Sequence, residues 1–151
     1  MIYAKNNLTN EISIFPQDDI IEGYTELSEE EIVQYELQRA KDIKIAENDR
    51  IRDDALNQGV VYNNVLFDSD INQKVNLSDK YDIMSDMDTV VWYGKDNKGL
   101  LCTKNDLLAI RNLITKLHSY CWENNAYIKE QIAEAKTLDE VNNINISYKD
   151  F

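Results

Sequence analysis

The amino-acid sequence predicts a small α+β protein. Three hairpin patterns and two long helical segments that open with capping signals support this fold class. We expect an N-terminal β-hairpin, a long helix, and a small antiparallel sheet of two hairpins packed on a long C-terminal helix. The 151 residues are enough for one ordinary core or a small core with an arm. The expected parts are a hairpin unit at 1–27, a connecting helix at 28–58, an α+β domain at 59–144 and a tail at 145–151.

The first hairpin is expected from strands at 2–4 and 11–15 around a turn at 6–10. Pro16 ends the second strand, because proline cannot donate a hydrogen bond to a strand ladder. A two-stranded hairpin is marginal in water by itself. We therefore expect either a helix or a partner protein to cover it.

A capping box formed by Ser28 and Glu31 predicts the start of the long helix, which runs from about residue 29 to 57. Gly59 follows its end. Its apolar residues form only a thin stripe: Ile32, Val33, Leu37, Ala40, Ile43, Ala46, Ile51 and Leu56. Two interpretations stay open, a solvated helix lying across one small domain and an intermolecular helix or loose coiled coil.

The pair Asn63-Asn64 lies between two short apolar segments and tolerates the positive φ angles of a type I′ turn, which predicts a hairpin over 60–67. Residues 70–86 are amphipathic but rich in Asn, Asp and Ser, and they are expected to form one or two short helical turns. Strands at 89–93 and 100–102 predict another hairpin. The two hairpins together are expected to form a sheet of about four strands.

Thr103 and Asp106 form another capping signal, which opens a helix to about residue 136. An apolar seam follows its 3 and 4 spacings, with one skip at Asn124: Leu107, Ile110, Ile114, Leu117, Cys121, Ile128 and Ile132. A last short helix is expected from Thr137 through Ile144. The tail at 145–151 is expected to be ordered by a neighbouring protein.

The chain is strongly acidic, with 28 acidic residues, 16 basic residues and a formal charge of −12. No cluster of Lys and Arg interrupts this bias, which disfavours binding to nucleic acid or to an anionic membrane. No apolar run is long enough to span a membrane, and the first residues do not resemble a signal peptide. Cys102 and Cys121 lack the CxxC spacing and are expected to be buried thiols.

The sequence holds little that points to catalysis. His118 and Cys121 lie three residues apart, as a nucleophile and base can, but a packed Cys beside a hydrogen-bonded His accounts for them more simply. The aspartates between 68 and 88 do not follow a calcium-loop pattern, and no glycine-rich phosphate loop is present. We therefore predict no catalytic, cofactor or metal residues. An enzyme acting on cell-wall glycan stays as a third class of function.

The chain contains nine Tyr, two Trp and three Phe, and aromatic side chains dominate interface energetics. Those near the two ends lie in segments too short to form their own core. Either they fold back on the domain or they dock on another chain. The predicted protein-binding residues are Tyr3, Phe15, Tyr24, Val33, Leu37, Tyr148 and Phe151.

An ordered set of residues from Ile51 to about Ile144 resembles a family of uncharacterised domains in tailed-phage and prophage proteins, often encoded beside tail fibres. The residues that carry the resemblance are Arg52-Asp53, Leu56, Gly59-Val60, Tyr62-Asn63, Phe67 to Asp70, Gln73, Val91-Trp92, Asp96-Asn97, Leu100, Thr103, Leu107, His118, Cys121, Lys129, Ile132, Ala135 and Thr137 to Val141. Asn64 departs from the pattern, which often has Gly there. The segment 77–88 also departs, being more polar than usual.

The resemblance implies a non-enzymatic virion protein of the tail, baseplate or tail-fibre region, made in the host cytoplasm and acting as a connector through protein–protein contacts. Its partners would be other phage tail or fibre proteins, and we expect a homo-oligomer or a stoichiometric complex. The alternative is a tail-fibre assembly chaperone that is absent from the mature virion.

Overall fold

The computed structural model describes residues 1–16, 22–149 and 151. Residues 17–21 of the predicted N-terminal unit and residue 150 of the predicted tail lie outside this description. The strands are β1 (Ile2–Asn6), β2 (Ile12–Phe15), β3 (Tyr24–Glu26), β4 (Val60–Tyr62), β5 (Val65–Phe67), β6 (Thr89–Tyr93) and β7 (Gly99–Thr103). The helices are α1 (Glu29–Leu56), α2 (Ile71–Ile83), α3 (Lys104–Glu134) and α4 (Leu138–Asn143). The predicted α+β class is confirmed.

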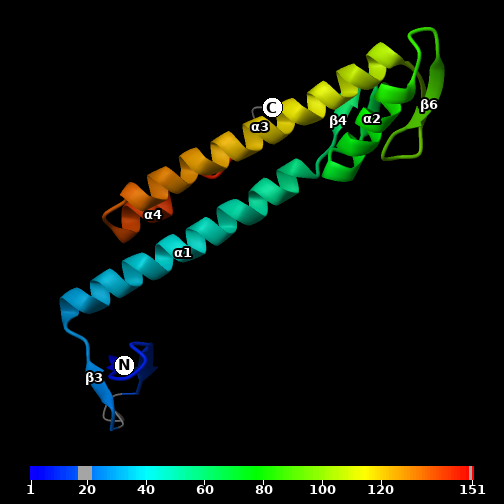
Figure 1. Ribbon diagram of the computed structural model, residues 1–151. Coiled ribbons are helices and arrows are strands. Elements are labelled where there is room, and N and C mark those ends of the chain that lie inside the picture. Colours follow the sequence, from blue (N-terminus) through cyan, green and yellow to red (C-terminus); the bar gives the residue numbers. More distant parts are fainter. Residues whose placement is uncertain (17–21, 150) are drawn as a thin grey trace.

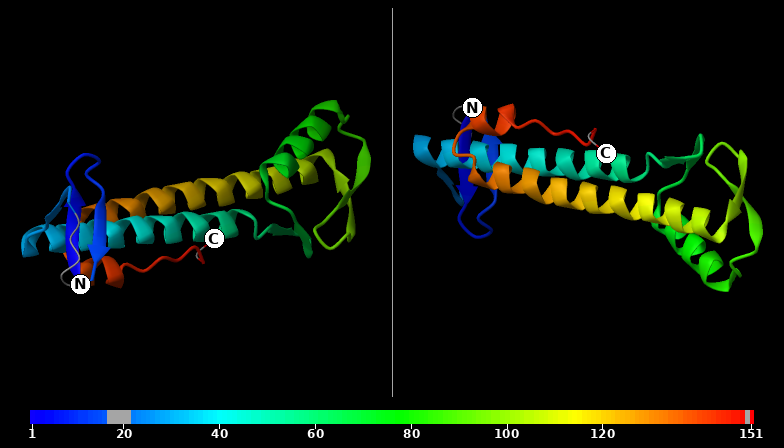
Figure 2. Two further views of the ribbon diagram at one scale, coloured as in Figure 1. Left: turned by 90° about the horizontal axis from the view of Figure 1, so that it is seen from below. Right: turned by 90° about the horizontal axis from the view of Figure 1, so that it is seen from above.

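The molecule is a rod built on two antiparallel helices (Figures 1 and 2). Helices α1 and α3 lie side by side over most of their length. The N-terminal sheet projects from one end of the rod, beside the start of α1. Helix α2 and the hairpins β4–β5 and β6–β7 gather at the other end, which we call the head. At 1.5 Å per residue, the 31 residues of α3 alone span about 46 Å.

The N-terminal sheet has three strands in the order β2-β1-β3, and all its pairings are antiparallel. The predicted hairpin β1–β2 is present. The strand β3 was not predicted, because three residues after Gly23 give too short a pattern to recognise. Gly23 has a φ of +92°, which favours glycine, and its carbonyl accepts a hydrogen bond of 2.9 Å from the amide of Asn7. This bond helps to place β3 against β1.

Both long helices begin at the predicted capping boxes, at Ser28 with Glu31 and at Thr103 with Asp106. The predicted seam of α3 is confirmed, because all seven of its residues are buried. Helix α3 packs against α1 along the rod and against α2 in the head (Figure 1). Burial of these apolar side chains stabilises the packing of α3 on its neighbours.

The two head hairpins remain separate two-stranded sheets, so the expected four-stranded sheet does not form. Asn63 and Asn64 adopt the positive φ angles predicted for their turn, 49° and 60°. The hairpins touch through Gly94, where an added Cβ would lie 2.5 Å from the carbonyl oxygen of Leu66. The amide of Lys95 donates a hydrogen bond of 2.7 Å to the same oxygen.

Two further expectations differ from the structure. The segment expected to form one or two helical turns forms the 13-residue helix α2. The carboxylate of Asp70 caps its start by accepting a hydrogen bond from the amide of Gln73. Buried Leu77 attaches α2 to the core although its other residues are mostly polar. In the described part of the tail, Ile146 and Tyr148 pack on the core of the same chain.

Candidate protein-binding site

The N-terminal sheet attaches to α1 through Tyr3. Its hydroxyl donates a hydrogen bond to the carboxylate of Glu36, and its ring lies edge-on to Tyr35 at 6.0 Å between centroids. The bond to Glu36 raises the pKa of Tyr3. Leu27 is buried, and its amide donates a hydrogen bond of 2.8 Å to the carbonyl of Tyr3. These contacts define how the sheet projects from the helix.

Phe15 and Tyr24 come from the two edge strands and meet across the middle strand. Their rings are T-shaped, with centroids 5.1 Å apart. They lie on the face of the sheet that also carries Ala4, which is fully buried. Phe15 and Tyr24 therefore build a small core on this face of the sheet and are partly buried.

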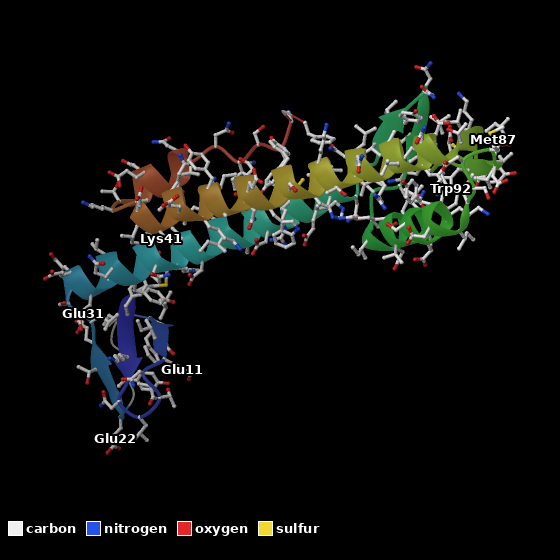
Figure 3. All side chains as sticks on the ribbon, turned by 45° about the horizontal axis from the view of Figure 1, so that its top comes forward. Glu11, Glu22, Glu31, Lys41, Met87 and Trp92 are labelled. Atoms are coloured by element: carbon white, nitrogen blue, oxygen red, sulfur yellow. The ribbon has the colours of Figure 1, made fainter. Side chains whose placement is uncertain are left out.

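A groove of about 630 Å³ lies between the sheet and the first turns of α1. It is lined by Lys5, Asn10, Ile12, Leu27, Ser28, Glu30, Glu31, Gln34, Tyr35 and Gln38. Lys5 is the only Lys or Arg before Arg39 in the sequence, whereas this stretch contains many glutamates. Figure 3 shows three of them, Glu11, Glu22 and Glu31, around this end of the rod. The groove itself is lined by two glutamates, Glu30 and Glu31, and one lysine, so its charged side chains are mainly acidic.

A smaller groove of about 340 Å³ lies between α1 and the start of α4. Its apolar lining comes from Val33, Leu37 and Leu138, and its polar lining from Lys136, Thr137 and Asp139. Val33 is 60% exposed and Leu138 is 41% exposed. This groove adds an apolar surface to the acidic end of the rod.

The structure brings together some of the predicted protein-binding residues. Tyr3, Phe15 and Tyr24 lie in one sheet, and Val33 and Leu37 line one groove, although Leu37 is itself buried. Tyr148 is only 5% exposed and packs in the core of its own chain. Phe151 is exposed and packs beside Tyr120. The last two therefore lie away from the N-terminal end.

A polar network that the sequence analysis missed joins α1 to α3 near the middle of the rod. Asn48 is fully buried, donates a hydrogen bond to the carbonyl of Asn125 at 3.2 Å and accepts one from the hydroxyl of Tyr148 at 2.8 Å. Asp49 accepts hydrogen bonds from Asn125 at 3.0 Å and from Lys129 at 3.0 Å. The network holds two helices and the tail in one alignment.

Arg52 completes the charged side of this network. Its guanidinium lies 2.8 Å from Asp49 and stacks 4.4 Å from the ring centroid of Trp122. Burial raises the pKa of Asp49, but the hydrogen bonds from Lys129 and Asn125 and the two cations outweigh it, so the pKa is lowered overall. The carboxylate is thus held in its charged form.

His118 and Cys121 are packed as the simpler interpretation predicted. The Nε2 atom of His118 lies 2.6 Å from the carbonyl oxygen of Ser69. Cys121 is fully buried, and burial raises the pKa of its thiol. Burial also raises the pKa of Cys102, to about 11. Both thiols are free, and their raised pKa values disfavour the reactive thiolate.

Within residues 1–16, 22–149 and 151, no group of three or more His, Cys, Asp or Glu side chains is arranged to hold a metal ion. In the same part of the chain, no helix combines the length and apolar character needed to cross a membrane.

Residues 39–147, more than half of the chain, match the model of one protein family, Domain of unknown function (DUF4376). The chain belongs to this family. The family segment contains the second half of α1, the whole head, α3 and α4. The N-terminal sheet and the first turns of α1 lie outside it. No curated protein and no solved structure is detectably similar to the chain.

The family segment therefore coincides with the part of the rod that the polar network and the seam hold together. The acidic groove and Val33 lie before this segment. The sequence carries a signal for the two buried asparagines. Asn48 shares a helix face with Ala55, and Asn125 shares one with Cys121, so a polar residue falls in each case on an apolar face.

Proposed function

We propose that the chain is a non-enzymatic virion protein of a phage tail, baseplate or tail-fibre region and acts there as a connector. The phage context comes from the sequence resemblance over residues 51–144. The single observation that supports a connector is the arrangement of the rod, in which the N-terminal sheet and the head lie at opposite ends of a braced helix pair (Figure 1).

The N-terminal end supplies the docking surface in this proposal. It combines acidic side chains around the larger groove with the apolar groove at Val33 and Leu138. A matching partner presents basic side chains around an apolar segment, because opposite charges steer association and apolar burial stabilises the complex. The partner is another tail or fibre protein.

The test is the protein content of purified particles. Mass spectrometry is expected to find this chain in a fixed ratio to a tail protein. Particles that carry Val33→Glu are expected to contain much less of it, whereas the matched variant Ile43→Glu, on an equally exposed part of α1, retains the wild-type amount. Wild-type particles without any peptide of this chain would refute the virion role.

The alternative proposal is an assembly chaperone for a tail fibre. The open apolar groove between α1 and α4 favours it, because a chaperone covers an apolar segment only temporarily. Co-expression separates the two roles. A chaperone raises the yield of soluble fibre and is missing from finished particles, and an unchanged yield would exclude it.

A further inference from the structure

Residues 144–148, which we call the strap, run from α4 back along the helix pair towards the head (Figure 2). They form neither a helix nor a strand. The side chains of Ile144, Ile146 and Tyr148 pack on the core, whereas Asn145 between them is exposed. The strap therefore contacts the molecule with every second side chain, as an extended peptide does.

The surface beneath the strap, which we call the seat, comes from both long helices. It consists of Asn48, Ile51 and Ala55 of α1 and Tyr120 and Asn124 of α3. The hydroxyl of Tyr148 donates a hydrogen bond of 2.8 Å to Oδ1 of Asn48, and its ring lies edge-on to Tyr120 at 6.5 Å between centroids. The amide group of Asn124 donates a hydrogen bond of 2.7 Å to the carbonyl oxygen of Ser147.

Side-chain contacts, and not a strand ladder, hold the strap on the seat. Among the described residues, no backbone–backbone hydrogen bond joins residues 145–149 to another segment. A narrow groove of about 270 Å³ stays open beside the strap, lined by Ile51 and Ala55 on one side and Ile146 on the other. A segment attached by so few buried side chains opens at a lower free energy than the whole fold.

The helix pair has ties of its own that do not involve the strap. The side chain of Asn48 donates a hydrogen bond to the carbonyl of Asn125, and the carboxylate of Asp49 accepts hydrogen bonds from Asn125 and Lys129. The apolar seam of α3 is buried as well. The strap can therefore leave the seat while α1 and α3 remain paired.

A buried thiol borders the seat and reports on its cover. Cys121 follows Tyr120 directly and is fully buried. Burial raises the pKa of Tyr148, and the nearby Cys121 thiol contributes to the rise, so the two side chains lie close together. Cys102 is equally buried but lies in β7, in the head and away from the strap.

We propose that the strap opens from the seat while the helix pair stays closed, and that the open seat binds an extended protein segment of the same pattern. The pattern is an apolar side chain at the first and third positions and a tyrosine at the fifth, as Ile144, Ile146 and Tyr148 show in the closed state. The covalently attached strap has a high effective concentration, so a competing segment gains the seat only where it is itself concentrated, as in an assembly.

This binding surface is separate from the docking surface at the N-terminal end of the rod. It depends on contacts within the helix pair and not on a virion role. The two proposals therefore fail independently, because the content of particles does not report on the seat and the opening of the strap is measured on the isolated chain.

Alkylation of the full chain by iodoacetamide, with the two thiols resolved by peptide mass spectrometry, tests the opening. In the wild type, low concentrations of urea are expected to change the rate at Cys121 very little, because a local opening exposes little surface. Tyr148→Ala is expected to speed alkylation of Cys121 about tenfold and to change that of Cys102 less than about twofold. Tyr127→Ala, at an exposed tyrosine of α3, is the matched control and is expected to leave both rates unchanged.

A synthetic peptide with the sequence of residues 144–149 tests the open seat. At about 1 mM, it is expected to slow the alkylation of Cys121 in the Tyr148→Ala protein towards the wild-type rate. The same peptide with Tyr148→Ala is expected to give no protection. Equal acceleration of both thiols in the Tyr148→Ala protein would overturn the separate opening of the strap, and equal rates with the two peptides would overturn binding at the seat.

Discussion

Asn48 and Asn125 show how single polar residues define the alignment of the helix pair. An apolar seam alone tolerates sliding of one helix past another, whereas a buried amide is satisfied in only one alignment. Asn48 reaches both Asn125 and Tyr148, and Asp49 reaches both Asn125 and Lys129. In the described part of the chain, no buried side-chain nitrogen or oxygen lacks a partner.

The variant Asn48→Ala tests the contribution of the buried amide. It leaves the hydroxyl of Tyr148 and the carbonyl of Asn125 without this partner, and we expect the free energy of unfolding to fall by about 1–3 kcal/mol. Urea denaturation followed by circular dichroism measures the loss. Asn76→Ala, at an exposed site on α2, is the matched control, and an equal loss in the two variants would contradict the role of Asn48.

The lowered pKa of Asp49 predicts a stability change in acid. Its carboxylate stabilises the fold at pH values above its unfolded pKa of about 3.9, and this contribution is lost as the pH falls through the lower pKa of the folded state. Between these two pKa values the unfolded chain binds more protons, so stability rises with pH there. Asp49→Asn is expected to reduce this rise.

Urea denaturation at a series of pH values between about 2 and 6 measures the slope for Asp49→Asn and the wild type. The variant Asp79→Asn, which removes one carboxylate from an exposed position on α2, corrects for the change in net charge. Identical slopes for Asp49→Asn and the wild type would show that Asp49 has no such linkage.

At the scale of elements, the sequence predicted the start of a helix or the position of a turn wherever a capping or turn residue marked it. Ser28, Thr103 and Thr137 each begin a helix as predicted. The length of α2 was missed because its polar residues hide one attachment point, Leu77. The sequence could not show how the two head hairpins lie against each other, because their contact at Gly94 and Leu66 joins segments that are distant along the chain.

The turn between β4 and β5 gives a test at this scale. Asn64 has a φ of 60°, so Asn64→Ala is expected to lower the free energy of unfolding by about 1 kcal/mol. Asn64→Gly adopts this angle without strain and is expected to match or exceed the stability of the wild type. Thermal denaturation compares the two, and equal melting temperatures for both variants would contradict the prediction.

At the scale of the whole molecule, α1 is one half of an antiparallel helix pair within its own chain, and its interpretation as an intermolecular helix or loose coiled coil stays a prediction. The helix is neither isolated nor laid across a globule, because α3, α4 and the tail pack along it (Figure 2). Its thin apolar stripe is enough for this purpose because the polar network supplies further contacts at Asn48 and Asp49. Val33, Ile43 and Ala46 are the parts of the stripe that remain exposed.

An elongated molecule has a larger radius of gyration than a globule of the same length. A compact chain of 151 residues is expected to have a radius of gyration of about 15 Å. Small-angle X-ray scattering from the monomer, at low concentration, is expected to give a clearly larger value and a skewed distance distribution. A value near that of a globule would show that the rod folds back on itself in solution.

The bond between Tyr148 and Asn48 joins residues 100 positions apart, and this separation has a consequence for protein synthesis. When α1 leaves the ribosome, neither its antiparallel neighbour nor the tyrosine that reaches its buried amide has yet been translated. The helix pair therefore closes only after nearly all of the chain has emerged, and newly made α1 must remain unpaired during that interval.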